Sequence, residues 1–349
     1  MDVRNAIIAL IVSIISLTGI SCSSTTIIDG VEGIELRKLI GKKDVIALPY
    51  EETARGLIII PVQTEFGQSS FLIDTGATRS ALFKGSEDSL IDKSEFVGVA
   101  NIIGLVNSGH HQMVKVAELN LGKRRFKDMT VAVLPERTKI DNELMSIDPG
   151  GIIGMDVLAE YNLLVDADEK QIYFIPFKYP KPFLSRVWKP VYLYHNPHSA
   201  LDKNLHFFDV RVGNHIIPAI LDSGAEFNVI NWEATIIPEI RRLQRRLRKD
   251  WEIQGALGEF DPAVKIDVNF LRAGQMSWRK SQFIIMNFDH LDGLGFADKP
   301  LVIAGSSIFQ NQSFYLNFDS NQLWLKTEGL TAVEQRTGEA NHSVTFDTR

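Results

Sequence analysis

The sequence predicts an all-β protein built from two similar lobes. Three observations support this fold class. The chain has 349 residues, more than a single hydrophobic core usually organises, so two domains are expected. A heptapeptide with an Asp at its centre occurs twice, and each copy is followed by a second matching motif at nearly the same distance. The segments around both copies are short, β-branched and apolar, which is typical of strands.

The repeated heptapeptide indicates an internal duplication. Residues 71–77 (FLIDTGA) recur as residues 219–225 (AILDSGA). Downstream of the first copy, residues 152–154 (IIG) end 80 positions after its Asp. Downstream of the second copy, residues 303–305 (IAG) end 83 positions after its Asp. Because two motifs recur at nearly one spacing, we interpret the chain as a tandem repeat.

Each copy has its own set of predicted strands. In the first copy, strands at 57–62 and 70–74 are joined by a turn at 65–68 and form a β-hairpin. The other predicted strands lie at residues 113–121, 126–134 and 161–166 in the first copy and at residues 207–212 and 315–319 in the second. Gly and Asp separate these strands, as in sandwich and barrel folds.

The boundaries follow from changes in composition. Several prolines with little periodicity lie between the copies, which favours an irregular connection there, and the C-terminal end is polar. We therefore expect a signal peptide at 1–22, a tether or propeptide at 23–54, an N-terminal lobe at 55–178, an interlobe connection at 179–204, a C-terminal lobe at 205–327 and a polar tail at 328–349.

The N-terminus carries an apolar run that ends at the only cysteine, Cys22. Residues 6–20 are too few for a bilayer span of about 20 residues and suit the apolar region of a signal peptide. The following residues Gly19 to Cys22 resemble a bacterial lipoprotein signal, in which the cysteine is lipidated and becomes the new N-terminus. Gly19, where Leu is usual, and Asp2 depart from that pattern, and an uncleaved anchor or an ordinary signal peptide are the alternatives.

Composition excludes several other classes of protein. A formal net charge of -6 gives no electrostatic basis for binding nucleic acid. One cysteine cannot form an intramolecular disulfide. The histidines have no acidic or cysteine partners at a recognisable metal-binding spacing, so we interpret them as surface residues and expect neither a metal nor a cofactor; they are His110, His111, His195, His198 and His206.

Both copies resemble the retropepsin and pepsin family of aspartic proteases, recognised by Asp-Thr/Ser-Gly and a later motif of two apolar residues and Gly. The resemblance covers nearly all of residues 55–326. It implies a two-lobed fold with pseudo-two-fold symmetry and a cleft between the lobes. It also implies roles for six residues: Asp74 and Asp222 are the catalytic pair, and Thr75, Gly76, Ser223 and Gly224 support them. In the family, the Thr75 and Ser223 hydroxyls would cross between the loops and hold them in register.

Two carboxylates suit peptide hydrolysis because it needs a base to activate water and an acid to protonate the leaving nitrogen. Like charges about 3 Å apart cannot both stay ionised, so one pKa of the pair rises and the other falls. The pair is then both acid and base. Gly76 and Gly224 let the chain turn sharply after each strand without a side chain that would obstruct the carboxylates.

Family members cover the active site with a mobile hairpin, the flap, and both copies have candidates for it. The first candidate includes Gly104, Val106, Ser108 and Gly109, located 30 to 35 positions after Asp74. The second includes Gly255 and Gly258, 33 and 36 positions after Asp222. Whether one flap or two would close is left open by the sequence.

Two residues depart from the family pattern. Glu226 lies four positions after Asp222, where the first copy has Thr78, and a third carboxylate would either raise the pKa of the pair or point to solvent. Ala304 replaces the usual apolar residue before the second Gly.

The sequence thus predicts a monomeric aspartic endopeptidase that acts on polypeptides outside the cytoplasm, in a bacterial cell envelope, and is anchored to the membrane by a lipid on Cys22. The alternative is a catalytically silent peptide-binding module of the same fold. Retention of both Asp74 and Asp222 favours the enzyme. Cleavage specificity, the optimum pH and removal of a propeptide cannot be read from the sequence.

Overall fold

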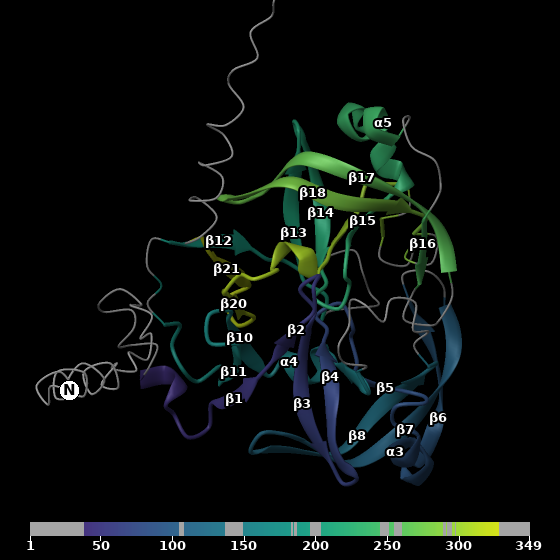
Figure 1. Cartoon of the computed structure of the whole chain (residues 1–349), viewed down its shortest axis with the longest axis vertical. Coiled ribbons are helices and arrows are strands. Elements are labelled where there is room, and N and C mark those ends of the chain that lie inside the picture. Colours follow the sequence, from purple (N-terminus) through teal and green to yellow (C-terminus); the bar gives the residue numbers. More distant parts are fainter. Residues whose placement is uncertain are drawn as a thin grey trace, which may run out of the picture.

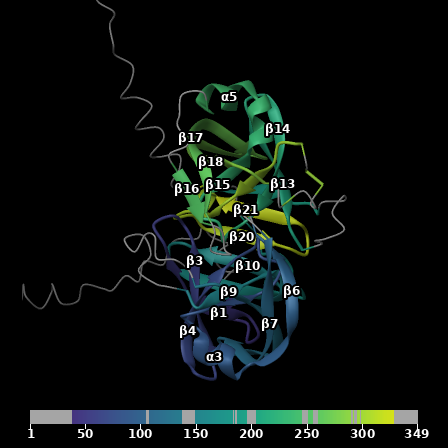
Figure 2. The same cartoon turned by 90° about the vertical axis from the view of Figure 1, so that its right-hand side faces the viewer.

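The computed structural model describes residues 38–104, 108–136, 149–182, 184, 187–195, 204–244, 251–254, 260–288, 291, 295–296 and 298–327. These residues form mostly β-strands with a few short helices, as the all-β prediction requires. The strands among these described residues form three sheets. In Figure 1 an eight-stranded sheet fills the lower half, a seven-stranded sheet fills the upper half, and a six-stranded sheet lies between them on the left. The view turned by 90° keeps the same order (Figure 2).

The eight-stranded sheet has the order β2-β3-β4-β9-β5-β8-β7-β6. Its strands are β2 (Glu51–Glu52), β3 (Ile58–Thr64), β4 (Gly67–Ile73), β5 (Ala81–Phe83), β6 (Glu95–Ile103), β7 (Ser108–Leu121), β8 (Arg124–Leu134) and β9 (Gly151–Ile153). The predicted hairpin is confirmed as β3 and β4, joined by a turn at Glu65 and Phe66, with Thr64 opposite Gly67. Gly67 has a φ of +129, which favours glycine.

The seven-stranded sheet has the order β13-β14-β19-β15-β18-β17-β16, which matches β3-β4-β9-β5-β8-β7-β6 strand for strand. Its strands are β13 (Phe207–Val212), β14 (His215–Leu221), β15 (Asn228–Asn231), β16 (Trp251–Gln254), β17 (Phe260–Ala273), β18 (Met276–Met286) and β19 (Val302–Ala304). Even the extra contact between β3 and β7 has a counterpart between β13 and β17. The recurring sequence motifs therefore accompany a recurring strand order.

The six-stranded sheet joins the two halves of the chain and has the order β1-β11-β10-β20-β21-β12. Its strands are β1 (Ile46–Pro49), β10 (Tyr161–Asp166), β11 (Gln171–Pro176), β12 (Trp188–Tyr192), β20 (Phe314–Asn317) and β21 (Gln322–Lys326). At its centre β10 pairs antiparallel with β20, with Leu163 opposite Leu316. Five of the six residues of β10 are buried, as expected for a strand covered on both faces.

Two segments are more regular than the sequence predicted. Residues 38–54, expected to be a tether or propeptide, include strand β1, which pairs with β11 and alternates buried and exposed residues. This alternation is too short to be distinctive in the sequence alone. The expected irregular connection at 179–204 includes β12, whose Pro190 is tolerated because β12 is an edge strand.

One large apolar core extends through all three sheets and includes Leu48, Phe71, Leu163, Phe208 and Leu325. Short helices close the sheet ends: α3 (Asp88–Lys93), α4 (Met155–Leu158), η1 (Trp232–Ile236), α5 (Pro238–Gln244) and η3 (Ser306–Ile308). No helix in the described part of the chain is long and apolar enough to cross a membrane.

Candidate active site

The two Asp-Thr/Ser-Gly motifs lie at equivalent places in the two larger sheets. Asp74 follows the last residue of β4, and Asp222 follows the last residue of β14. Each of these strands has a parallel neighbour that carries the later motif, β9 for β4 and β19 for β14. The backbone N–H of Asp74 donates to the Ile153 carbonyl at 3.1 Å, and that of Asp222 to the Ala304 carbonyl at 3.0 Å. Strand pairing thus fixes where each Asp leaves its sheet.

The two loops that follow are hydrogen-bonded to each other through Thr75 and Ser223. The Thr75 hydroxyl donates to the Leu221 carbonyl at 2.9 Å, and the Ser223 hydroxyl donates to the Ile73 carbonyl at 2.8 Å. Each hydroxyl also accepts the backbone N–H of the other residue, at 3.1 and 3.0 Å. Both side chains are buried. The structure therefore brings together these two residues in the crossing arrangement that the resemblance implied.

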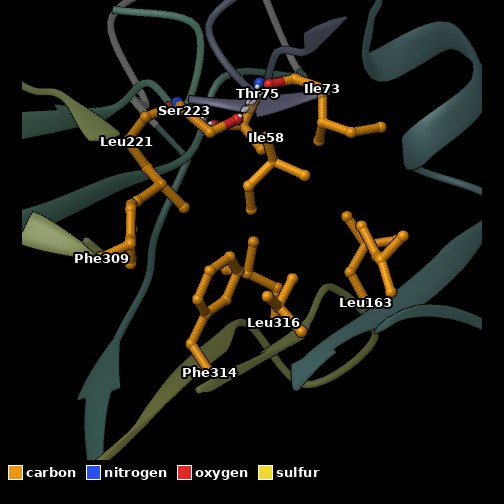
Figure 3. Close-up of a pocket in the computed structure, with 11 residues that line it drawn as sticks. Ile58, Ile73, Thr75, Leu163, Leu221, Ser223, Phe309, Phe314 and Leu316 are labelled. Carbon is orange, nitrogen blue, oxygen red and sulfur yellow. Dashed lines mark hydrogen bonds between the residues drawn. The ribbon is translucent and has the colours of Figure 1, made fainter. Parts of the chain in front are cut away.

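A small apolar cavity lies beneath this pair. It is lined by side chains from both halves of the chain, among them Ile58, Leu163 and Leu316. Figure 3 shows Thr75 and Ser223 at one edge of the cavity, with the apolar side chains turned toward its interior. The four hydrogen bonds are therefore made in an apolar, water-poor setting, where they are stronger than at the surface.

Gly76 and Gly224 bring the two carboxylates together. A Cβ on Gly76 would lie 2.4 Å from the Asp222 Cγ, and a Cβ on Gly224 would lie 2.3 Å from the Asp74 Cγ. Real Cβ atoms do not approach carbon this closely, so only glycine fits at either position. Each carboxylate thus rests directly against the glycine of the opposite loop, and the two Asp side chains lie face to face.

Backbone amides hold each carboxylate in place. Asp74 Oδ1 accepts the N–H groups of Gly76 and Ala77 at 2.8 and 2.9 Å. Asp222 Oδ1 accepts the N–H groups of Gly224 and Ala225, both at 3.0 Å. These short local bonds orient the two side chains in the same way and leave the second oxygen of each carboxylate for other partners.

The surroundings of Asp222 give its carboxyl a pKa that differs from that of an ordinary aspartate. Burial, the negative charge of Asp74 and a side-chain hydrogen bond with Asp74 raise the pKa of Asp222 well above its ordinary value. The N–H groups of Gly224 and Ala225 favour the ionised form but do not cancel this rise in pKa. The pair can therefore hold one proton at a pH where isolated aspartates are fully ionised.

Gly154 and Gly305, the glycines of the two later motifs, pack against the loops that follow Asp74 and Asp222. A Cβ on Gly154 would lie 2.5 Å from the Arg79 carbonyl carbon, and a Cβ on Gly305 would lie 2.2 Å from the Phe227 carbonyl oxygen. The next residue in each case donates its N–H to the loop, Met155 to the Ala77 carbonyl and Ser306 to the Ala225 carbonyl. Glycine is thus required because the loop backbone packs against it.

Two further supporting residues were not predicted from the sequence. Ser80 accepts the Gly154 N–H at 3.1 Å and donates to Asp156, while Asn228 accepts the Gly305 N–H at 3.1 Å. Both are buried. Ser80 and Asn228 each lie six positions after the Asp of their copy, so a comparison of polar residues at equal offsets would have found them.

The flap candidates are described only in part. Gly104, Ser108 and Gly109 lie at the end of the β6–β7 hairpin, where Ser108 is exposed and the two glycines are half-buried. Val106, Gly255 and Gly258 lie outside the described residues. The second hairpin, β16–β17, occupies the place in its sheet that β6–β7 occupies in the first. A flap function for either hairpin stays a prediction.

The structure describes the surroundings of Glu226 and Ala304, the two residues that depart from the family pattern. Glu226 is half-buried and forms an ion pair with Arg55 at 3.7 Å, so it does not extend freely into solvent. Ala304 is buried in β19 opposite Leu221, where its small side chain fits the sheet.

The interpretation of the histidines as surface residues is wrong for His206. Its ring is buried between His195 and Phe318, with centroid distances of 4.6 and 4.8 Å. Its position before an apolar strand gave no signal for this burial. His195 and His110 are exposed, and His198 lies outside the described residues. No group of three or more His, Cys, Asp or Glu in the described ranges is arranged to hold a metal ion. Cys22 also lies outside them.

Comparison with known proteins supports the family at a coarse level. A family model described as aspartyl protease matches residues 64–157, which contain Asp74 and the Gly154 motif. The matched segment spans β4 to α4, the part of the first sheet that positions Asp74. No curated protein matches the chain.

Proposed function

We propose that this protein is an aspartic endopeptidase that hydrolyses peptide bonds with a water molecule activated between Asp74 and Asp222. The observation that carries the proposal is the contact of each carboxylate with the glycine of the opposite loop. This contact places two acids side by side, one of which has a raised pKa. The aspartyl protease match over residues 64–157 supports a peptidase independently of this geometry.

The proposed mechanism assigns the shared proton to Asp222, because its pKa is raised, and the role of base to Asp74. Asp74 takes a proton from water while the water oxygen attacks the carbonyl carbon. Asp222 gives its proton to the carbonyl oxygen, which yields a neutral diol. Asp222 then takes a proton from one diol hydroxyl as Asp74 donates its proton to the amide nitrogen, and the C–N bond breaks. The pair returns to its starting state, having consumed one water.

We propose two lobes related by a pseudo-two-fold axis, with the substrate in a cleft between them. The shared strand order of the two larger sheets and the paired hydrogen bonds of the two loops support this arrangement. We propose that the two lobes comprise residues 55–178 and 205–327 and that they arose by duplication. Because a cleft between lobes accepts an extended chain, the proposed substrate is a polypeptide. Because one chain carries both Asp74 and Asp222, we propose that the protein acts as a monomer.

We propose further that the protein is a lipoprotein of a bacterial cell envelope, anchored through Cys22. The support is the short apolar run before a sole cysteine. In cells fed a fatty-acid analogue, the wild-type protein should incorporate the label and the Cys22→Ala variant should not. Wild-type protein that stays unlabelled and soluble would contradict the anchor without affecting the proposed peptidase.

A peptide-library digest tests the proposed activity. Purified protein is incubated with the library over a range of pH in water enriched in ¹⁸O, and new termini are mapped by mass spectrometry. We expect internal cuts at a defined set of sites, with one ¹⁸O in each new carboxyl group, because the attacking oxygen comes directly from water. Peptides that bind without being cut would favour the silent binding module instead.

A further inference from the structure

Two exposed isoleucines lie at the end of the seven-stranded sheet that carries α5. Ile236 is the last residue of η1 and is 66% exposed, and Ile216, near the start of β14, is 58% exposed. η1 leads into α5, which lies at the upper end of the molecule in both views (Figure 1, Figure 2). A Cβ on Gly213, in the turn between β13 and β14, would lie 2.6 Å from a carboxylate oxygen of Glu239 in α5. The two isoleucines therefore belong to elements that contact each other at one end of the molecule.

An arginine accompanies each isoleucine. Arg241 Nε donates to the Thr235 carbonyl at 2.9 Å, so its side chain folds back onto the residue before Ile236. Arg211 lies directly opposite Ile216 in the pairing of β13 with β14, which puts the two side chains on the same face of the sheet. An exposed apolar side chain beside a cation suits a bilayer surface, because the apolar group enters the boundary of the acyl chains while the cation stays among the headgroups.

The arginines at this end are not balanced by carboxylates. Arg211 lies opposite Arg272 of β17, and both are exposed, so two like charges face each other across a strand pair. Like charges in this arrangement destabilise a sheet, and an anion bound between them would relieve the repulsion. In the described part of the chain, Arg211, Arg272 and Arg242 have no carboxylate partner. Glu239 lies against the β13–β14 turn, and Asp209 accepts a tyrosine hydroxyl at 2.9 Å.

This basic end contrasts with the charge of the whole chain, which is -6. The run that begins at Arg241 continues in the sequence at 245–249 (RRLRK), outside the described residues. Clusters of four or more Lys or Arg attract anionic lipid headgroups, and each cation strengthens the attraction by about fivefold. The proposed lipid anchor would already bring the protein to a membrane. The 15 residues between Cys22 and Lys38 span at most about 50 Å, so the described part of the chain would stay close to that membrane.

We propose that a docking surface for an anionic lipid bilayer is formed at this end by Arg211, Ile216, Ile236, Arg241, Arg242 and Arg272. The isoleucines enter the boundary between headgroups and acyl chains, and the arginines bind lipid phosphates. Asp222 follows Ile216 by six residues, which is about 20 Å of extended strand. Docking therefore holds the second catalytic loop near the membrane surface. The docking surface works whether or not the protein cleaves peptides.

Site-specific fluorescence on the full chain tests the docking surface. In a Cys22→Ser background, which removes the lipidation site and the only native thiol, one cysteine is introduced as Ile236→Cys or Ile216→Cys and labelled with the environment-sensitive dye NBD. The matched control is Val99→Cys in β6, where the side chain is 59% exposed. The vesicles contain phosphatidylcholine alone or with about 30% phosphatidylglycerol. Because the N-terminal apolar run is the same in every variant, a difference between labelled sites reports the site itself.

Emission of the dye at positions 236 and 216 should rise and shift to the blue with phosphatidylglycerol only, and nitroxide-labelled lipid should quench it. The dye at position 99 should not respond. Arg211→Gln or Arg241→Gln should each lower the ratio of docked to undocked protein by about fivefold. Lys123→Gln, at an exposed position on the β7–β8 turn, should leave the ratio unchanged, and circular dichroism confirms that each variant is folded.

Three outcomes would overturn the docking surface. The first is an equal response of the dye at positions 236 and 99, and the second is a ratio that folded Arg211→Gln and Arg241→Gln both retain. The third is an equal rise in emission with a DNA duplex or polyglutamate, which would show a site for polyanions in general. Absent peptide cleavage by the wild type would contradict only the proposed peptidase, and absent lipid on Cys22 would contradict only the proposed anchor.

Discussion

Thr75 and Ser223 bind each other reciprocally across the two halves of the chain: the backbone N–H of each donates to the hydroxyl of the other, at 3.1 and 3.0 Å. Each hydroxyl donates onward to the strand that leads into the opposite loop. The two residues are 148 positions apart, so they close a long stretch of chain at one buried point. These hydrogen bonds hold together the two loops that carry Asp74 and Asp222.

The first prediction concerns Ser223. Ser223→Ala removes the hydrogen bond to the Ile73 carbonyl and leaves the buried Thr75 N–H without its acceptor, so it should lower the free energy of unfolding by about 1–3 kcal/mol. Ser223→Thr keeps the hydroxyl and should therefore keep most of the free energy of unfolding that Ser223→Ala loses. Urea unfolding measures both, with the exposed Ser320→Ala as the control. Equal stability of Ser223→Ala and Ser320→Ala would contradict the prediction.

The second prediction concerns Gly224. In Gly224→Ala the new Cβ would overlap the Asp74 carboxyl carbon, so the carboxylate must move by about 1 Å, and kcat/KM should fall by about 100-fold. Gly67→Ala is the control, since a Cβ there meets nothing within 4 Å. Its positive φ should lower stability without affecting the rate at a temperature where both variants are folded. Wild-type kcat/KM in Gly224→Ala would show that the carboxylates do not lie face to face.

The third prediction concerns stability against pH. Burial and the charge of His195 lower the pKa of His206 to about 4, while an unfolded histidine titrates near 6.5. Between these values the unfolded state binds the extra proton, so stability should be complete above pH 6.5 and fall as the pH drops to about 4. His206→Asn should remove this part of the pH dependence, which is on the order of 3 kcal/mol.

Urea unfolding of wild type and His206→Asn from pH 4 to 7 measures that difference. Because carboxylates titrate in the same window in both proteins, only the difference between the two curves reports on His206. His110→Asn, at an exposed position, is the matched control for the His-to-Asn substitution itself. A constant difference across the window would mean that His206 titrates as an ordinary surface histidine.

The sequence predicted the parts of the molecule that are local and repeated. Asp74 and Asp222 were found because an apolar strand followed by Asp-Thr/Ser-Gly is a short pattern, and its recurrence made the pattern specific. Strand β13 was predicted with its observed bounds, and β10 likewise, since short segments rich in apolar and β-branched residues favour strands. Alternation and turn residues are encoded locally, so they could be read without the fold.

Long-range contacts could not be predicted in the same way. The pairing of β1 with β11 joins segments more than a hundred residues apart, and four residues carry too little pattern to specify that partner. The burial of His206 depends on Phe318, which is distant in the sequence. The contact of Arg55 with Glu226 likewise arises only when the two halves of the chain pack together. Such contacts are properties of the packed molecule rather than of any short segment.

In the proposed mechanism, Asp74 and Asp222 act as one catalytic unit. Asp74→Asn and Asp222→Asn each keep the size and shape of the side chain but prevent the sharing of a proton, so each should abolish cleavage. The double variant should be little worse than either single variant, since residues that act together are strongly non-additive.

The decisive measurement is the pH profile of kcat/KM on one fluorogenic peptide for wild type, Asp74→Asn and Asp222→Asn, with circular dichroism to confirm folding. The wild type should give a bell-shaped profile, which reports the pKa values of the pair, and neither folded variant should cleave the peptide measurably at any pH. Cleavage at a wild-type rate by either variant would show that the two carboxylates do not act as one unit.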